Sequence, residues 1–397
     1  MNSVCLISLP SPFLIDEKVF PPLGILYLST ALKYQGCDVA VHDGAIADIP
    51  SGFSHYAISA TTPQFPLAVK ALHHLRATGK SRVIIGGPHP TVDATSCKQA
   101  GFDGVVMGPG EVSLKLAIDY GCDLISTPFN TYIKPDRSAI DIKSYKYEID
   151  GRPATSVMTS RGCPYNCAFC CKSTGKVVLH PAEMVIKELE ELHDMYGYDG
   201  FQFFDDIFIA DRHRLYHILD AIQPWGIKWR GFVRADMLVK GNIEMVEKMR
   251  DSGCVEVGMG IESGSGTILK TIGKGETIGT IKHAIRLLQK YKIRVKGFFI
   301  VGLPGESHET IAETSHFVHD MQLDGADFSI YTPYKGSPIY EHKEKFDIGW
   351  NRLDLEHLWY KGTPGRYESQ VFTSTLNELQ ITEYRNELER SFKCLNA

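Results

Sequence analysis

The sequence lacks several features that define large classes of proteins. No uncharged apolar run reaches the about 18 residues that a membrane-spanning helix needs. The N-terminal segment, MNSVCLISLPSPF, has no basic region ahead of an apolar core and no small-residue cleavage site. We therefore expect no secretory signal and a cytoplasmic protein. Basic residues do not dominate either, since 42 Lys and Arg stand against 47 Asp and Glu. The net charge of −5 argues against a protein held to nucleic acid mainly by a basic surface.

Internal repeats and low-complexity segments are absent as well. At 397 residues the chain is long enough for two or three domains and for a large hydrophobic core that needs no disulfide bonds. Its ten cysteines do not form the spread framework of a secreted disulfide protein, because four of them crowd into residues 163–171. In a reducing compartment such a cluster indicates metal ligands or redox groups.

Residues 1–127 alternate short apolar runs with helical patterns. This alternation predicts a parallel sheet with ligand-binding loops at the carboxyl ends of its strands. The expected strands are 4–9, 38–42, 56–60, 82–85 and 104–107, and the expected helices are 23–34 and 66–77. Because only residues 45–54 separate the second and third strands, we expect no full helical crossover there and a pruned sheet.

Residues 128–153 are polar and without periodicity, which predicts a linker. Six strand–helix units follow in residues 154–335 and predict a partial (β/α)6 barrel, whose chemistry belongs at the carboxyl ends of the strands. The expected strands are 155–159, 200–204, 228–234, 255–260, 295–301 and 326–331; the expected helices are 182–196, 212–222, 242–251, 277–291 and 306–321. Residues 336–397 form a C-terminal extension that ends in a charged helix near 379–393.

Three cysteines carry the strongest chemical signal. Cys163, Cys167 and Cys170 have C-x3-C-x2-C spacing directly after the first strand of the predicted barrel. Thiolates suit iron–sulfur clusters and zinc. Three ligands leave one iron of a [4Fe–4S] cluster open to bind and reduce a substrate. Zinc is the alternative, with Cys171 or a distant residue as the fourth ligand, but the usual second C-x2-C pair is missing.

Segment 160–171 resembles the cluster loop of radical S-adenosylmethionine (radical SAM) enzymes. Further segments resemble the branch of that superfamily with an N-terminal cobalamin (B12)-binding domain: 203–206, 234–236, 260–264 and 297–306. The resemblance implies an α/β fold with a Rossmann-like domain of the flavodoxin or B12-binding type, a partial radical SAM barrel and a short C-terminal helical segment. It also implies a [4Fe–4S] cluster whose open iron chelates SAM and cleaves it to a 5′-deoxyadenosyl radical.

The resemblance places the polar SAM contacts at successive strand ends. Asp205 and Asp206 would accept hydrogen bonds from the methionine ammonium, with helix capping or a surface turn as the alternative. Arg234 would pair with the methionine carboxylate or else form a structural ion pair. Glu262, followed by Ser263, would hold the ribose hydroxyls, because one carboxylate accepts two hydrogen bonds.

The apolar SAM contacts are expected around the adenine. Phe169, just before the third cysteine, would offer its backbone. Ile300 and Val301 would pack near the ring, unless they serve the core alone.

Glycine-rich turns in the first domain resemble those of cobalamin-binding domains. Gly86, Gly87 and Gly108 would let the backbone approach a corrin ring or its nucleotide tail. The D-x-H-x-x-G signature of His-ligated cobalamin is absent, and residues 42–44 do not supply it. His89 would approach the cobalt or its tail, unless it is structural.

These features together predict a radical SAM enzyme that modifies an unactivated carbon of a small molecule by cobalamin-dependent methyl transfer. The resemblance implies an electron donor of the flavodoxin or ferredoxin type. Nucleic acid and membrane are not expected as partners, and the oligomeric state is left open.

Two other functions compete with methyl transfer. The first is cobalamin-independent dehydration, epimerisation, decarboxylation or rearrangement with a vestigial B12-like domain. Its candidate acids, bases or hydrogen donors are Cys254, Glu256, Tyr331 and Tyr334. The second is RNA modification, but the chain after Gly336 is short for an RNA-binding barrel plus a closing helix. The aromatic residues Trp350, Trp359 and Tyr360 are expected to shape the substrate pocket or the core.

Overall fold

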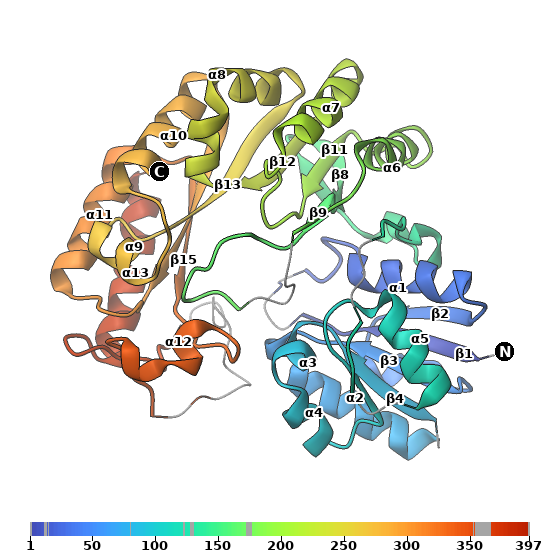
Figure 1. The fold of residues 1–397 in the computed structure, drawn as a ribbon. Helices are drawn as coiled ribbons and strands as arrows, with labels where there is room; N and C mark the ends of the chain where they lie inside the picture. The colour runs from blue at the N-terminus through green and yellow to red at the C-terminus, as the bar shows by residue number, and fades with distance from the viewer. Residues whose placement is uncertain are drawn as a thin grey trace. The chain divides into compact units, whose positions relative to one another are not determined.

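The computed structural model describes residues 2–11, 14, 16–79, 81–121, 124–127, 131–171, 177–351, 353 and 367–395. The chain divides into two compact units, the first made chiefly of residues 1–147 and the second chiefly of residues 148–397. Both are drawn in Figure 1. Across the described residues, every helix is too short or too polar to cross a membrane.

The first unit is built on a six-stranded parallel sheet with the order β2-β1-β3-β4-β5-β6. Its strands are β1 (Ser3–Ser8), β2 (Asp38–Asp43), β3 (His55–Ser59), β4 (Arg82–Gly86), β5 (Gly104–Val106) and β6 (Leu124–Ile125). Its α-helices are α1 (Leu23–Tyr34), α2 (Phe65–Thr78), α3 (Pro88–Val92), α4 (Ala94–Gln99) and α5 (Gly110–Tyr120).

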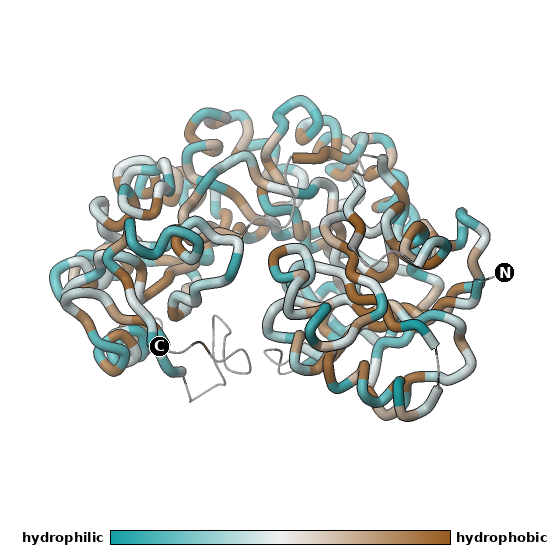
Figure 2. The backbone as a smooth tube through the Cα atoms, turned by 60° about the horizontal axis from the view of Figure 1, so that its bottom comes forward, coloured by the Kyte–Doolittle hydropathy of each residue, from teal (hydrophilic) through white to brown (hydrophobic). Residues whose placement is uncertain are grey.

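The sheet carries a separate hydrophobic core on each face, because successive strand side chains point to opposite sides. Val4 and Leu6 join the core that includes Ile25 of α1. Cys5 and Ile7 join the core that includes α2. Figure 2 shows hydrophobic stretches, in brown, in the part of the chain near the N-terminus. The expected Rossmann-like α/β domain with a parallel sheet is thereby confirmed.

The connection from β2 to β3 is as short as the sequence indicates. It contains only the 3₁₀ turn Ile46–Asp48 where a crossover helix would stand. The sheet itself is not interrupted, since β1 pairs in parallel with both β2 and β3. The first unit therefore lacks the helix that would connect β2 to β3, but the pairing of these strands in the sheet is intact.

The second unit contains a curled seven-stranded sheet with the order β15-β14-β13-β12-β11-β8-β7. Its strands are β7 (Tyr147–Ile149), β8 (Arg152–Val157), β11 (Gly200–Phe203), β12 (Lys228–Val233), β13 (Cys254–Glu262), β14 (Arg294–Val301) and β15 (Gly325–Ile330). The strands from β8 to β15 pair in parallel, so all their carboxyl ends lie at one edge.

Helices cover the outer face of this sheet (Figure 1). They are α6 (Ala182–Asp194), α7 (Arg212–Ile222), α8 (Ala235–Asp251), α10 (Ile278–Lys290), α11 (His308–Met321) and α13 (Glu378–Leu395), with α9 (Gly266–Thr271) and α12 (Pro338–Glu341) as short additions. A small pair, β9 (Ser160–Arg161) and β10 (Val178–Leu179), follows β8. The expected partial barrel is confirmed.

Two local predictions need correction. Helix α8 begins at Ala235 instead of residue 242, because Ala235 and Leu238 extend its buried stripe toward the N-terminus. Residues 147–149, expected in a linker, form β7 and lead into β8 through a turn with positive φ at Asp150 and Gly151. The linker boundaries otherwise stay a prediction.

Candidate functional site

The two acidic residues at the end of β11 hold the start of the cysteine loop. Asp205 is fully buried and accepts hydrogen bonds from the Thr159 backbone N–H (3.1 Å), the Thr159 hydroxyl (2.7 Å) and the Ser160 hydroxyl. Burial raises the pKa of its carboxyl. Asp206 is exposed, and its Oδ2 accepts the Gly162 N–H at 2.8 Å. Asp205 thus anchors the loop internally, and Asp206 of the two is the one open to a ligand.

The middle of the loop is fixed by backbone hydrogen bonds on both sides. Ala168 N–H donates to the carbonyl of Ile272 at 2.8 Å, and Ile339 N–H donates to the carbonyl of Ala168 at 3.0 Å. A third bond, from Cys170 N–H to the carbonyl of Cys167, closes a turn at 3.1 Å. Phe169 is half-buried in this turn. The loop is therefore shaped by the protein before any cofactor binds.

The three cysteines of the loop differ in their burial. Cys167 is buried, while Cys163 and Cys170 are partly accessible. Burial raises the pKa of Cys170 to about 11, and the neighbouring Cys167 and Cys163 add to that rise. Among the described residues, no three His, Cys, Asp or Glu side chains converge on a point suited to one metal ion. A [4Fe–4S] cluster binds each thiolate through a different iron, so its ligands stand apart.

Arg234 lies between this loop and a group of acids. Its Nη1 is 4.0 Å from the Cys167 sulfur, and its guanidinium lies 3.6 Å from the ring centroid of Tyr165. Its Nε pairs with Asp236 at 3.1 Å, and the Tyr165 hydroxyl donates to the same carboxylate at 2.8 Å. Arg234 is 6% exposed, so the structure gives it the ion-pair role. Pairing with the methionine carboxylate stays a prediction.

Glu262 ends β13 in a strained conformation. Its φ is +66°, and the pairing of β13 with β14 shifts between Gly260 and Glu262. Such irregularities re-aim side chains and recur at functional sites. Its Oε1 is 2.8 Å from the Lys274 ammonium, and a Cβ on Gly260 would lie 2.5 Å from the same oxygen. A side chain at position 260 would therefore displace this carboxylate.

Sequence reasoning missed two residues of this group, Lys274 and Glu276. Both side chains are almost wholly buried, at 5% and 0% exposed. They flank Gly275 in the loop between α9 and α10, and charged residues beside a loop glycine are usually at the surface. The sequence offered one signal for these two residues, the Lys-Gly-Glu segment 274–276, which follows the strand that ends at Glu262.

The other predicted SAM contacts differ in how far their side chains are buried. Ile300 is half-buried and Val301 is 1% exposed, because neighbours on a strand point to opposite faces. Only Ile300 lies on the inner face with the partly exposed Phe298. The Ser263 hydroxyl is fully buried and contacts Thr314 Oγ1 at 3.2 Å. The side chains of Val301 and Ser263 are thus buried, and contact of these residues with SAM stays a prediction.

The glycine turns of the first unit lie at the carboxyl edge of its sheet, after β4 and β5. Gly87 has a φ of +101°, and a Cβ there would lie 2.9 Å from Ser59 Oγ. Gly86 accepts a hydrogen bond from Ala60 N–H, and Gly108 N–H donates to Thr91 Oγ1 at 2.9 Å. Ligands of open parallel sheets bind at this edge. The contact with Ser59 shows that the packing of the protein itself requires glycine at position 87, and an approach of a corrin ring to these turns stays a prediction.

His89 is built into the domain as a structural residue. Its ring nitrogens contact Thr62 Oγ1 at 3.2 Å and Ser96 Oγ at 3.0 Å, and the ring stacks on Phe65. It is 2% exposed. Both nitrogens are engaged, so His89 does not have the geometry of a cobalt ligand.

The candidate acids, bases and hydrogen donors do not lie together. Cys254 starts β13 and Glu256 follows it, which places both at the amino edge, away from the cysteine loop. Tyr331 directly follows β15, at the carboxyl edge, and burial raises its phenol pKa. Tyr334 lies beyond it on the same connection. Trp359 and Tyr360 fall outside the described residues, whereas Trp350 stacks on Tyr340.

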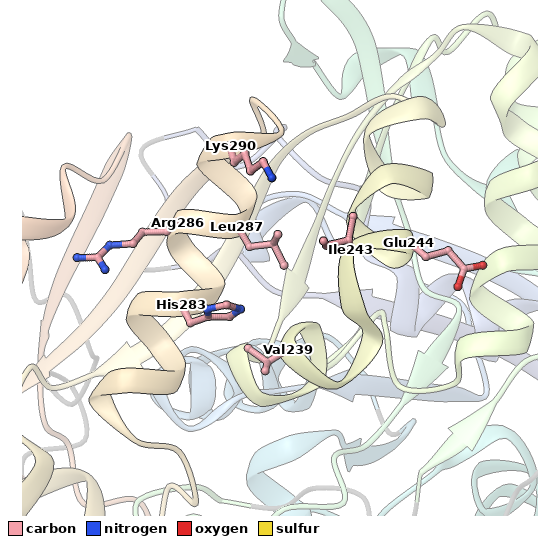
Figure 3. A pocket seen from close by; sticks show the side chains of 7 residues that line it. All are labelled: Val239, Ile243, Glu244, His283, Arg286, Leu287 and Lys290. Carbon is pink, nitrogen blue, oxygen red and sulfur yellow. The ribbon is translucent and has the colours of Figure 1, made fainter.

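The second unit also has a groove on its outer helices, apart from the cysteine loop. Val239, Ile243 and Leu287 lie between α8 and α10 (Figure 3). The polar lining is formed by Glu244, His283, Arg286 and Lys290. No predicted site residue lines this groove.

Comparisons with known proteins agree with this geometry. The radical SAM superfamily model matches residues 157–318, and the B12-binding domain model matches residues 17–118. An uncharacterized methyltransferase of Pyrococcus horikoshii is 34% identical over 385 residues, covering 86% of this chain and 82% of that protein. The bacteriochlorophyllide d C-12(1)-methyltransferase of Chlorobaculum tepidum is 28% identical over 392 residues, covering 92% and 82%.

A solved structure shows the same fold. The radical SAM methyltransferase TsrM from Kitasatospora setae, with cobalamin and a [4Fe–4S] cluster bound, superposes with a TM-score of 0.75 at 16% identity. The match covers 100% of this chain and 89% of TsrM. The chain therefore belongs to the radical SAM superfamily, in the branch with an N-terminal B12-binding domain. It is a radical SAM enzyme, and enzymes of this superfamily use a [4Fe–4S] cluster and SAM.

Proposed function

We propose that this enzyme is a cobalamin-dependent radical SAM methyltransferase that acts on an unactivated carbon of a small molecule. The observation that carries the proposal is the presence in one chain of a shaped three-cysteine loop and a B12-type sheet edge of small residues. Two relatives that match most of the chain are named methyltransferases, which supports the proposal. When bound, the cluster supplies the electron that splits SAM, and cobalamin supplies the methyl group.

The chain's own residues would hold and orient these groups. Cys163, Cys167 and Cys170 would bind the cluster, with Asp205 keeping the loop in place. Glu262 would hold the ribose of SAM. Gly86, Gly87 and Gly108 would face the corrin or its tail. Each turnover needs two electrons, one to split SAM and one to reduce the cobalamin after the methyl group leaves it, and both would come from an external protein of the flavodoxin or ferredoxin type.

The test uses the full chain, reconstituted anaerobically with iron and sulfide and then given hydroxocobalamin, SAM and a low-potential reductant. We expect the corrinoid to stay with the protein on gel filtration. Both S-adenosylhomocysteine and 5′-deoxyadenosine should form, the first reporting methyl removal and the second radical formation. Formation of 5′-deoxyadenosine without corrinoid binding would overturn methyl transfer and favour the cobalamin-independent reactions.

A pair of cysteine variants controls this test. Cys167→Ala should lose iron and 5′-deoxyadenosine but keep the corrinoid. Cys171→Ala, in the same loop, should keep all three, because its thiol donates to the carbonyl of Lys335 at 3.3 Å. Loss of iron in Cys171→Ala would instead support the reading in which Cys171 is a metal ligand.

A further inference from the structure

Five charged side chains form one buried network behind the cysteine loop. Their side chains are between 0% and 13% exposed. The network contains two cations and three carboxylates: Arg234, Lys274, Asp236, Glu262 and Glu276. Removing charges from water is costly, so a buried network of this kind is stable only if each charge faces an opposite one.

Glu276 is the member that lies near both cations, each of which also has a closer carboxylate partner. Its Oε1 accepts the Asp236 backbone N–H at 3.0 Å. Its Oε2 lies 3.5 Å from the Arg234 guanidinium and 3.6 Å from the Lys274 ammonium. Its side chain has no exposed surface. One buried carboxylate thus lies almost equally far from two positive charges that would otherwise repel each other.

The same two cations point toward the two halves of the predicted SAM site. Arg234 Nη1 is 4.0 Å from the sulfur of Cys167, a predicted cluster ligand. Lys274 Nζ is 2.8 Å from Oε1 of Glu262, the predicted ribose ligand. Arg234 also donates to the backbone carbonyl of Lys274 at 2.8 Å, which ties the two cations to each other.

We propose that Glu276 is a positioning residue. Through Arg234 and Lys274 it fixes the surroundings of the cluster and of Glu262, the predicted ribose ligand, at the same time. It holds Arg234 against the thiolate of Cys167 and keeps Lys274 shared between two carboxylates. The proposal rests on the radical SAM chemistry stated above. It adds a residue that touches neither cofactor and acts through the two cations.

Removing this charge has two linked consequences. The potential of an iron–sulfur cluster depends on nearby charge and on hydrogen bonds to its sulfurs. Without the carboxylate of Glu276, adding an electron to the cluster is easier, so its potential becomes less negative. Lys274 then pairs with Glu262 alone, which makes that carboxylate a poorer acceptor for the ribose hydroxyls. SAM binding weakens, by about tenfold if about 1.4 kcal/mol of this interaction is lost.

The experiment compares Glu276→Gln with a matched control at the opposite edge of the same sheet. Glu256 also lies between two cations, 3.4 Å from Arg230 and 3.5 Å from Arg294. Each reconstituted full-length variant is assayed for iron per chain, for cluster midpoint potential by redox titration followed by electron paramagnetic resonance, and for SAM affinity through the perturbed cluster signal.

We expect Glu276→Gln to keep its iron, to shift the potential to less negative values and to weaken SAM binding about tenfold. Glu256→Gln should leave both quantities at the wild-type values. A wild-type potential and SAM affinity in Glu276→Gln, or equal shifts in Glu256→Gln, would overturn the proposal.

A conservative variant keeps the test decisive if Glu276→Gln loads no iron. In Glu276→Asp the carboxylate is one methylene shorter and withdraws from both cations, so smaller shifts in the same directions are expected. No shift in that variant would overturn the proposal too. Failure of the wild-type cluster to respond to SAM would instead contradict the proposed function itself.

Discussion

Replacing Asp205 with alanine tests whether one buried carboxylate holds the cysteine loop. Two donors of Thr159 and the hydroxyl of Ser160 aim at it, and no part of Asp205 reaches solvent. Asp205→Ala leaves all three donors without this acceptor. A buried donor without an acceptor costs about 1–3 kcal/mol, and local rearrangement recovers part of the sum. We therefore expect a loss of about 3–5 kcal/mol in the free energy of unfolding.

Urea unfolding of the apo-protein, followed by tryptophan fluorescence, measures this loss. All four tryptophans lie in residues 225–359, so the signal follows the second unit. Asp205→Asn, which keeps one oxygen acceptor, should lose about 1–3 kcal/mol. Asp211→Ala is the control, because Asp211 caps α7 through a 2.7 Å bond from Arg214 N–H, and such caps contribute about 1 kcal/mol.

Loading of the cluster gives a second readout. We expect the iron content of Asp205→Ala to fall well below that of Asp211→Ala, since only the first change releases the loop. If the two variants unfold within about 0.5 kcal/mol of each other and load equal iron, the anchoring argument is refuted.

Three further changes have expected outcomes. In Gly260→Ala the new methyl group meets the carboxylate of Glu262, so SAM affinity measured by equilibrium dialysis should fall about tenfold while iron content is retained. Burial raises the pKa of Glu306 from 4.5 to about 8, so its protonation stabilises the folded protein below about pH 4.5, and this stability is lost as the pH rises through 8. Glu306→Gln should remove that dependence, and parallel Tm-against-pH curves for variant and wild type would contradict it. His89→Ala should leave the visible spectrum of bound cobalamin unchanged, and a new axial-ligand band in the wild type alone would show that His89 binds cobalt.

Much of the fold was predictable because the relevant signals are local. Helix α1 spans Leu23–Tyr34 and helix α7 spans Arg212–Ile222, as their apolar periodicity and flanking residues indicate. The expected strands of both sheets fall within a few residues of their predicted positions, whereas the short edge strands β6 and β7 were not predicted. Cys5 and Cys97, which stand outside the cysteine cluster of residues 163–171, lie in the core of the first unit.

The site was less predictable because register and strand face decide which side chains meet. Asp205 and Asp206 are adjacent in the chain, yet one is buried as an anchor and the other is exposed. Ile300 and Val301 lie on opposite faces of β14. Cys254 and Glu256 belong to β13, but they lie at its amino end, whereas the site residue Glu262 lies at its carboxyl end. Such distinctions depend on where a strand begins and how it pairs.

The sequence by itself indicated the class of enzyme through the resemblance of residues 160–171 and the later strand-end segments to radical SAM enzymes, because such motifs are short-range properties of the chain. It also determined the length of the β2–β3 connection, and hence the missing helix. Only the tertiary structure decided that Lys274 and Glu276 return to the cysteine loop and share a buried network with Arg234. The physical reason is that a charge in a loop can be buried only when distant residues supply its counter-charge, and that pairing exists only once the sheet has curled.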